Sequence, residues 1–247
     1  MKHLLILVAM QAEAQGVIQH FNLVHLGSLG SNLPMQVYAG TIQASNQVYQ
    51  LTLVTSGQDL RYQVDNIGTE AATLSAFAAI QQFKPDLVLN IGTAGGFADQ
   101  GASIGTVYLS TNHFIYHGRY VPLAGFCDSV QGNYPALNTD KLAHHLALPQ
   151  GVISTGNSFK RDESEVTQMK NNQVVAKEME AAAIAWVCGL SQIPFIAMKS
   201  ITNLLDHELS SEHQFEKNLY FACRALWNNC IQLIDVFMTP SLTDLFD

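Results

Sequence analysis

The sequence predicts an α/β fold, a three-layer sandwich in which helices flank a mixed, twisted central sheet. Short apolar runs that are typical of buried strands alternate with helical patterns along the 247 residues. No repeat or linker interrupts this alternation. We therefore expect a single domain over residues 1–238 and a tail at 239–247.

The first half of the chain predicts strands and helices in alternation. The helix at 66–83 is expected to bury one apolar stripe, made by Ile67, Ala71, Leu74, Phe77 and Ala78. The glycine-rich run Gly92-Thr93-Ala94-Gly95-Gly96 is interpreted as a tight turn after a strand. The expected elements are a strand at 4–10, a helix at 12–21, strands at 35–42 and 48–55, the helix at 66–83 and a strand at 86–91.

The second half continues the pattern after an irregular segment. Residues 111–135 are rich in aromatic side chains and are interpreted as a long functional or interface loop. The other expected elements are strands at 106–109, 152–155, 173–177 and 193–202, and helices at 181–190 and 212–237.

The composition narrows the classes of function. Hydrophobic residues make up 48% of the chain and charged residues 13%, which predicts a large core and a partner subunit, so we expect a homodimer. The net charge is −8 and there is no basic run, so nucleic acid is not an expected partner. No apolar run reaches the length of a membrane span.

The cysteines and histidines predict neither disulfides nor a metal site. The four cysteines, Cys127, Cys188, Cys223 and Cys230, form no CxxC pair, which favours reduced thiols and a cytoplasmic protein. No histidine pattern has convincing zinc-ligand spacing. We therefore expect no metal and no cofactor.

Two polar groups follow apolar runs near the end of the chain. Glu178-Met179-Glu180 ends one run, and Asn203 and Asp206 follow another. Ligands bind outside the carboxyl ends of strands in open parallel sheets, so Glu180 and Asn203 are candidates for one small-molecule site. A carboxylate can accept both hydroxyls of a ribose. Glu178 and Glu180 are two residues apart, so at most one of them should line the site.

The remaining candidate residues also have structural interpretations. Glu13 could orient a water as a general base, or it could be a solvated residue in a first helical turn. Thr93 could donate hydrogen bonds to a sugar or base, although a tight turn alone explains the glycines. Asn203 and Asp206 could equally be a turn residue and a cap.

Five segments together resemble the purine nucleoside phosphorylase and nucleosidase superfamily, and most of all the methylthioadenosine/S-adenosylhomocysteine nucleosidases of the plant type. The resemblance runs from about residue 4 to about residue 237. Each motif alone is weak, and the set in this order is specific. The segments are Val8–Gln15, Lys84–Asp86 with Asn90–Phe97, Gly101–Gly105, Ser154–Ser158 and Glu178–Ala183.

The resemblance implies a purine nucleoside as substrate and a role for each matching residue. Glu13 would orient the attacking water. Met179 and Glu180, next to Glu178, would hold the ribose. The rest would form the base end of the site: Thr93, Ala94 and Gly95 its floor, Phe159 a stacking ring, Lys160 backbone contacts to the purine edge, and Thr202 and Asn203 the pair beside the purine N7.

Asn203 departs from the nucleosidases, which carry an aspartate that protonates N7. An amide can hydrogen-bond N7 but cannot deliver a proton. Ile201-Thr202-Asn203 reproduces a motif of the trimeric 6-oxopurine phosphorylases, yet their base-recognising glutamate corresponds here to Lys160. Asn203 could mark a shift towards 6-oxopurines, a weakly active binding homologue, or an engineered change.

Hydrolysis is favoured over phosphorolysis by the sequence. A phosphorylase needs cationic donors for phosphate, and the first 150 residues offer only Arg61 and Arg119 as arginines. Asp59 adds a carboxylate where the anion would lie. The expected function is hydrolysis of the N-glycosidic bond of methylthioadenosine or S-adenosylhomocysteine. A 6-oxopurine enzyme, a phosphorylase or a nucleoside-binding protein are the alternatives.

Overall fold

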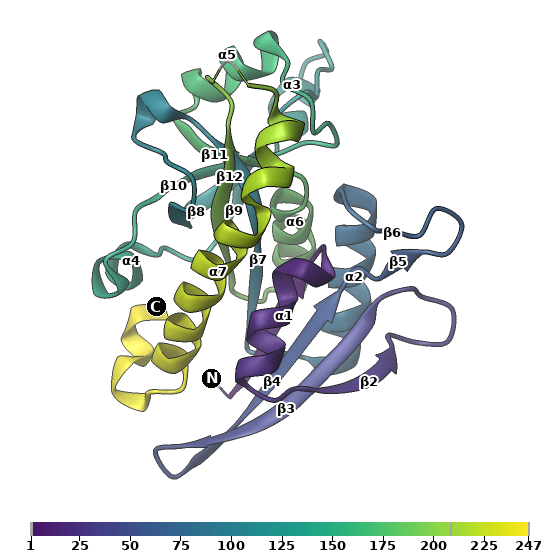
Figure 1. The fold of residues 1–247 in the computed structure, drawn as a ribbon, viewed down its shortest axis with the longest axis vertical. Coiled ribbons are helices and arrows are strands. Elements are labelled where there is room, and N and C mark those ends of the chain that lie inside the picture. Colours follow the sequence, from purple (N-terminus) through teal and green to yellow (C-terminus); the bar gives the residue numbers. More distant parts are fainter. Residues whose placement is uncertain (1, 208, 247) are drawn as a thin grey trace.

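The computed structural model, which describes residues 2–207 and 209–246, has the mixed sheet and flanking helices that the sequence predicts (Figure 1). The elements are β1 (His3–Val8), α1 (Gln11–His20), β2 (Val24–Ser28), β3 (Gln36–Ala44), β4 (Gln47–Thr55), β5 (Gln58–Asp59), β6 (Val64–Asp65), α2 (Thr69–Phe83), β7 (Leu87–Gly96), η1 (Ala98–Gln100), β8 (Val107–Tyr116), α3 (Phe126–Gln131), β9 (Tyr134–Pro135), α4 (Asp140–Leu146), β10 (Gln150–Thr155), α5 (Glu163–Asn171), β11 (Val174–Glu178), α6 (Ala181–Ser191), β12 (Phe195–Leu204), α7 (Ser211–Phe237) and η2 (Pro240–Phe246).

The main sheet has the strand order β11-β10-β8-β12-β7-β1-β4-β3-β2, with β9 beside β8. Strand β7 pairs in parallel with β1 and β12. Its last residues, Gly95 and Gly96, also pair in antiparallel fashion with Lys177 and Ala176 of β11. This last pairing closes β7, β12, β8, β10 and β11 into a ring, so the carboxyl ends of β7, β11 and β12 lie close together.

Alternation along β1 divides the core into two layers. Leu5 and Leu7 pack in the cluster that includes the buried residues of α2 and α6. Leu4, Ile6 and Val8 pack on the opposite face, with α1 and α7. Successive side chains of a strand point to opposite faces, so a fully apolar run is what a strand covered on both faces requires.

The glycine-rich run 92–96 is not the tight turn that the sequence predicts but the end of β7. Its glycines have no positive φ, so they are required for space and not for backbone conformation. A Cβ on Gly95 would lie 2.9 Å from Nδ2 of Asn203. The glycines therefore let neighbouring side chains lie over the strand.

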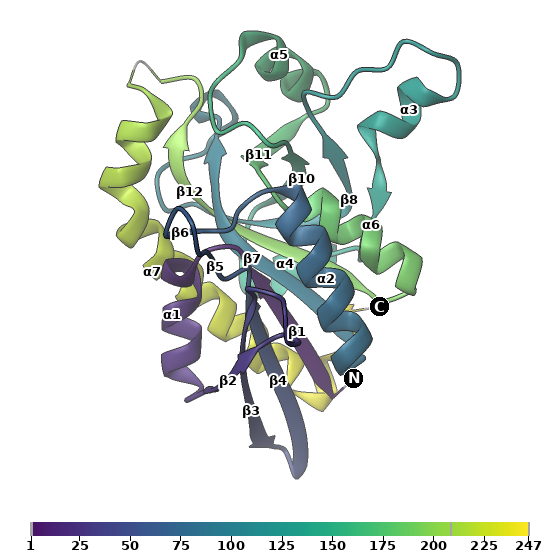
Figure 2. The same ribbon diagram turned by 90° about the vertical axis from the view of Figure 1, so that its right-hand side faces the viewer.

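The predicted buried stripe of the helix at 66–83 is wrong. Helix α2 begins at Thr69 and buries Ala72, Ala76, Ala79 and Ile80 against the sheet. Leu74 and Phe77, by contrast, are 42% and 56% exposed. Figure 2 shows α2 beside α6, whose Trp186 is 45% exposed. The small alanines face the sheet because they allow close approach, which leaves the bulky side chains on an outer face.

Two further expectations need correction. Residues 111–135 are not irregular throughout, because β8 continues to Tyr116 and α3 and β9 follow. Figure 2 shows α3 at the end of a segment that projects from the sheet. The expected tail at 239–247 instead contains η2, whose Phe246 is buried and packs on Phe237 of α7 with ring centroids 5.9 Å apart.

Three cysteines, Cys188, Cys223 and Cys230, are buried free thiols, and burial raises the pKa of each. The side chain of Cys127 lies outside the described residues.

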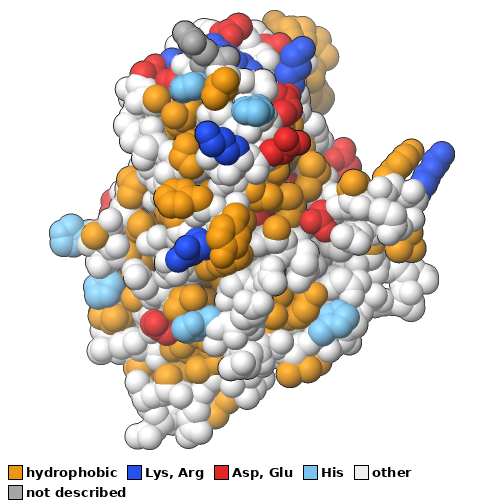
Figure 3. All heavy atoms as spheres, in the orientation of Figure 1, with side chains coloured by type: hydrophobic (Ala, Val, Ile, Leu, Met, Phe, Trp, Pro, Cys, Tyr) orange, Lys and Arg blue, Asp and Glu red, His pale blue; other side chains and the backbone are white. Residues whose placement is uncertain are grey.

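Figure 3 shows hydrophobic side chains among polar ones on the face that carries α7 and α1. Within the described chain, no helix is both long and apolar enough to cross a membrane.

Candidate active site

A pocket of about 600 Å³, including the space that opens to solvent, lies at the carboxyl ends of β1, β7, β11 and β12. Most of the residues that the sequence singles out line it: Glu13, Thr93, Ala94, Gly95, Phe159, Glu178, Met179, Glu180, Thr202 and Asn203. Lys160 is absent from this lining, and Asp206 lies outside it, accepting hydrogen bonds from the backbone N–H groups of Ala98 and Asp99.

Glu13 is a buried carboxylate in the first turn of α1, only 3% exposed. Its Oε1 accepts from the N–H of Thr93 at 2.7 Å and from the Thr93 hydroxyl at 2.8 Å. Burial raises the pKa of Glu13, although the Lys199 charge and the Thr93 hydrogen bonds oppose the shift. A fixed carboxylate with a raised pKa is suited to accept a proton from a water.

Helix α7 holds Glu13 from behind and also reaches the pocket. The indole Nε1 of Trp227 donates to the main-chain oxygen of Glu13 at 2.7 Å. Twelve residues earlier in α7, Phe215 lines the pocket and packs edge-on against Phe159, with ring centroids 5.4 Å apart. One helix therefore supports both the carboxylate and the aromatic wall.

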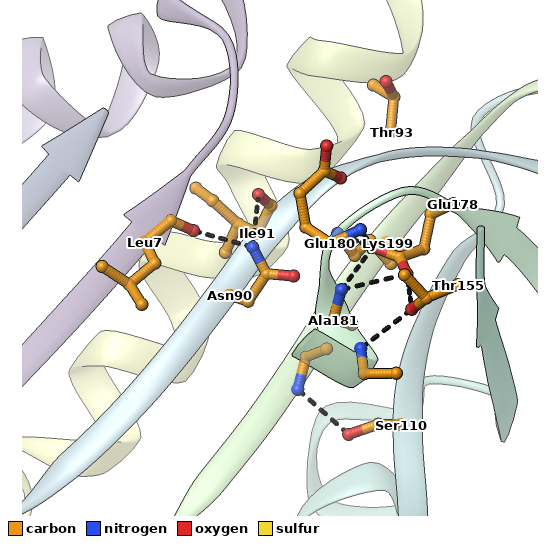
Figure 4. A network of polar contacts seen from close by, with 12 residues as sticks. Leu7, Asn90, Ile91, Thr93, Ser110, Thr155, Glu178, Glu180, Ala181 and Lys199 are labelled. Atoms are coloured by element: carbon orange, nitrogen blue, oxygen red, sulfur yellow. Dashed lines mark hydrogen bonds and ion pairs between the residues drawn. The ribbon is translucent and has the colours of Figure 1, made fainter. Parts of the chain in front are cut away.

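Glu178 and Lys199 form a buried ion pair beneath the pocket, with 2.8 Å between Oε2 and Nζ and 1% exposure of each side chain. Glu178 also accepts from the N–H groups of Glu180 and Ala181, at the start of α6, and from the hydroxyl of Thr155 (Figure 4). All of these partners are groups of the protein itself, so the role of Glu178 is to cap the start of α6 and to neutralise Lys199.

Glu180 is the second carboxylate of the pocket. Its Oε1 accepts from the N–H of Gly68 at 2.9 Å. Burial, followed by the Glu178 charge, raises the pKa of Glu180 to about 7, with Lys199 opposing. Figure 4 shows the carboxyl group of Glu180 directed away from the Glu178–Lys199 pair, on the side of Thr93. Glu180 can therefore accept hydrogen bonds from hydroxyls of a ligand.

Asn203 lies near the end of β12 and is 3% exposed. The hydroxyl of Thr202 donates to Oδ1 of Asn203 at 2.9 Å and lies 3.2 Å from the main-chain oxygen of Ala94. Oδ1 accepts this hydrogen bond, and Nδ2 lies above Gly95, on the pocket floor. The amide therefore presents donors to a ligand.

Several residues at the site were not assigned a role from the sequence. Lys199 is a charged residue inside an apolar strand, and a buried cation needs an anionic partner, which was the available signal. Lys177 lines the pocket, and its Nζ donates to the main-chain oxygen of Lys160 at 2.8 Å. Ala9, Met10 and Ser158 also line the pocket and lie in the segments that resemble the family, whereas Ile67, Leu205 and Phe215 had no signal beyond their apolar character.

Among the described residues, no cluster of three or more His, Cys, Asp and Glu side chains is arranged to bind a metal ion. The chemistry that the pocket residues themselves offer is a fixed base, a carboxylate acceptor, amide and hydroxyl donors and an aromatic wall. Such a set fits a substrate with an aromatic base and a hydroxylated sugar.

Comparison with known proteins gives one consistent family. The model of the phosphorylase superfamily matches residues 3–232. A 5'-methylthioadenosine nucleosidase of Arabidopsis thaliana is 34% identical over 240 residues, which cover 96% of this chain and 88% of that protein. A 5'-methylthioadenosine/S-adenosylhomocysteine nucleosidase of the same plant is 30% identical, covering 97% and 93%.

The fold comparison agrees. The apo structure of Arabidopsis thaliana 5'-methylthioadenosine nucleosidase superimposes with a TM-score of 0.91 at 33% identity, covering 97% of this chain and 96% of that one. The structure of 5'-methylthioadenosine/S-adenosylhomocysteine nucleosidase from Neisseria meningitidis with methylthio-immucillin-A has a TM-score of 0.76 at 22% identity, covering 95% of this chain and 99% of that one. This similarity is one of fold.

Proposed function

Because the chain belongs to the phosphorylase superfamily, among the 5'-methylthioadenosine and S-adenosylhomocysteine nucleosidases, we propose that it hydrolyses the N-glycosidic bond of such purine nucleosides. The observation that carries the proposal is the buried carboxylate of Glu13, which Thr93 fixes in the same pocket as Glu180 and Asn203. A fixed base beside a hydroxyl acceptor is what attack of water on a ribose requires.

Each residue has a defined part in the proposed reaction. Glu180 accepts hydrogen bonds from the ribose hydroxyls, and Phe159 stacks on the purine. Glu13 takes a proton from the water that attacks C1' as the bond to N9 breaks. Asn203 donates a hydrogen bond to the base through Nδ2, because Thr202 occupies Oδ1.

We propose that Asn203 stands at the position where the family has a catalytic acid, and that this substitution lowers kcat. An amide polarises N7 but delivers no proton, and general acid catalysis is worth about 10²- to 10⁴-fold. Asn203→Asp should therefore raise the kcat for methylthioadenosine by a factor in this range, with little change in nucleoside binding. The measurement is release of free base from methylthioadenosine, S-adenosylhomocysteine, adenosine and inosine, with and without phosphate, followed by chromatography.

One observation favours a second candidate, an enzyme for 6-oxopurine nucleosides. With Oδ1 of Asn203 occupied, Nδ2 offers two N–H donors, which match the N7 and O6 acceptors of hypoxanthine better than N7 and the amino group of adenine. In that case inosine is cleaved faster than methylthioadenosine, and Asn203→Asp lowers inosine turnover. The same assay therefore separates the two candidates.

Phosphorolysis and simple binding are further outcomes of that assay. The pocket lining contains one basic side chain among the described residues, Lys177, which supports hydrolysis over phosphorolysis. Phosphate-dependent release of base would contradict hydrolysis. A purine that raises the melting temperature, with no release of base from any nucleoside, would indicate a binding protein.

The protein is also proposed to be a cytoplasmic homodimer. Support for the dimer comes from the outer face of α2 and α6, where Leu74, Phe77 and Trp186 are exposed beside one another on one hollow of the surface. Light scattering should give about twice 27.0 kDa, and Phe77→Asp should give a monomer. The free cysteines support a reducing compartment, which cell fractionation tests.

A further inference from the structure

Lys177 is a buried lysine that lines the pocket, and none of the roles proposed above uses it. It is 6% exposed and lies near the end of β11. Burying an ammonium group is costly unless it is paired. A buried cation in a pocket wall is therefore a candidate for a role in the reaction.

The strand register places Lys177 close to Asn203. Gly95 of β7 pairs with Lys177 of β11 on one side and with Asn203 of β12 on the other. Residues paired across neighbouring strands direct their side chains to the same face of a sheet. Gly95 has no side chain, so the amide of Asn203 lies over it from one neighbouring strand, and Lys177 starts from the other.

Two partners hold the ammonium group of Lys177. Nζ of Lys177 donates to the main-chain oxygen of Lys160 at 2.8 Å and pairs with Oε2 of Glu165 at 3.0 Å. An ammonium group has three N–H donors, so one remains after the two partners found among the described residues. Both partners also anchor the segment that carries Phe159, the stacking ring.

Neither of the other two basic groups near the floor can supply positive charge to the base. Lys199 pairs with Glu178 beneath the pocket and is not part of the pocket lining, whereas Lys177, which pairs with Glu165, does line it. His117 is buried and hydrogen-bonded to Ser154, and burial together with the Lys177 charge lowers the pKa of His117 to about 3. The imidazole is therefore neutral at ordinary pH.

We propose that Lys177 is a catalytic residue which donates a hydrogen bond to the departing purine and stabilises its negative charge, in partial compensation for the absence of an acid at Asn203. The proposal rests on the proposed nucleosidase function. The amide N–H of Asn203 and the ammonium group of Lys177 come from the two strands that pair with Gly95, and two such donors suit a leaving group that departs as an anion.

The step balances without a further reactant. The C1'–N9 bond breaks and its electron pair stays on the purine. A bond forms between C1' and the oxygen of water, whose proton passes to Glu13. Lys177 keeps its proton while the purine anion is bound, and the anion takes a proton from solvent, or from Glu13, on release.

The test compares two ribosides whose leaving groups differ in how much stabilisation they need, and each variant is compared with the native protein on the same substrate. Methylthioadenosine must expel a basic purine, whereas 4-nitrophenyl riboside expels a stable phenolate. Removal of one preorganised donor costs about 10²- to 10³-fold in kcat. Lys177→Met should lower kcat for methylthioadenosine by about this factor and change kcat for the nitrophenyl riboside by less than about threefold.

Three variants complete the series. Lys177→Arg keeps the charge and should retain most of the turnover. Lys177→Gln keeps a neutral donor, should be intermediate, and serves as the second variant if the methionine variant does not fold. Lys170→Met removes a lysine that is paired with Asp99 on the surface and should leave both substrates unaffected.

The outcomes separate this inference from the function on which it rests. An equal loss for both substrates, or no loss across the series, would overturn the role of Lys177 and leave hydrolysis intact. A native protein that releases no base from any nucleoside would overturn the nucleosidase proposal itself. In the variant Asn203→Asp, with an acid restored, the effect of Lys177→Met should shrink, and an undiminished effect also counts against the proposed compensation.

Discussion

Lys199→Met is expected to destabilise the protein strongly, because it leaves the Glu178 carboxylate without its cation. The two side chains are 1% exposed and 2.8 Å apart, and breaking a buried pair by removal of one partner costs about 3–5 kcal/mol. For a domain of this size, 1 kcal/mol shifts the melting temperature by about 2–4 °C. The expected fall in Tm is therefore about 6–20 °C.

The double variant Lys199→Met/Glu178→Gln identifies the cause. Removal of both charges relieves the unpaired carboxylate, while the amide oxygen of the glutamine can still accept from the N–H of Ala181. At least half of the lost stability should return. Lys170→Met breaks an exposed pair and should change the free energy of unfolding by less than about 1 kcal/mol. Calorimetry that finds the double variant less stable than Lys199→Met would refute the reasoning.

Three further predictions concern the pocket. In calorimetric titration, Glu180→Gln should bind a nucleoside more weakly than the native protein does and free purine equally well, because one acceptor oxygen becomes a donor. A nucleoside affinity equal to that of the native protein would show that Glu180 is not part of the ribose site. Because the folded-state pKa of Glu180 is about 7 and the ordinary value is 4.5, the native state binds the extra proton between these values. The free energy of unfolding should therefore fall as pH rises through this window, by at most about 1.4 kcal/mol per unit, and Glu180→Gln should flatten the profile of Tm against pH. Gly95→Ala should lower turnover while the far-ultraviolet circular dichroism stays unchanged, since the added Cβ would lie 2.9 Å from Nδ2 of Asn203 and 3.1 Å from Leu205; full activity would show that the floor tolerates a methyl group.

The sequence predicted the elements of the fold more reliably than the faces they present. The strand at 4–10 was identified because a strand that is covered on both faces is apolar throughout. The helix at 212–237 was identified because its buried residues repeat with the period of a helix. The face of α2 was misassigned because an apolar stripe does not reveal which partner covers it. The closure of β11 onto β7 joins residues 80 and 82 positions apart (Ala176 with Gly96, Lys177 with Gly95), and no local pattern contains it.

For the site, the sequence likewise predicted which residues take part more reliably than how they are arranged. The set of motifs in order located the residues that line the pocket, because four of the five segments span the carboxyl end of a strand. A motif does not specify which residues pair across neighbouring strands, so the pairing of both Lys177 and Asn203 with Gly95 could not be predicted. The sequence favoured Glu180 over Glu178 as the ribose acceptor, but it predicted that only one of them lines the pocket, and both do. The ion pair of Glu178 with Lys199, which separates the roles of the two glutamates, depends on the fold.

The double attachment of α7 restricts the length of this helix as well as its composition. Phe215 and Trp227 are twelve residues apart, which is about 18 Å along the axis of an α-helix, and one supports the aromatic wall while the other supports Glu13. Deleting one residue between them would turn one contact about 100° away from the other. Insertions and deletions should therefore be excluded from this stretch in active relatives, even where substitutions on its outer face are tolerated.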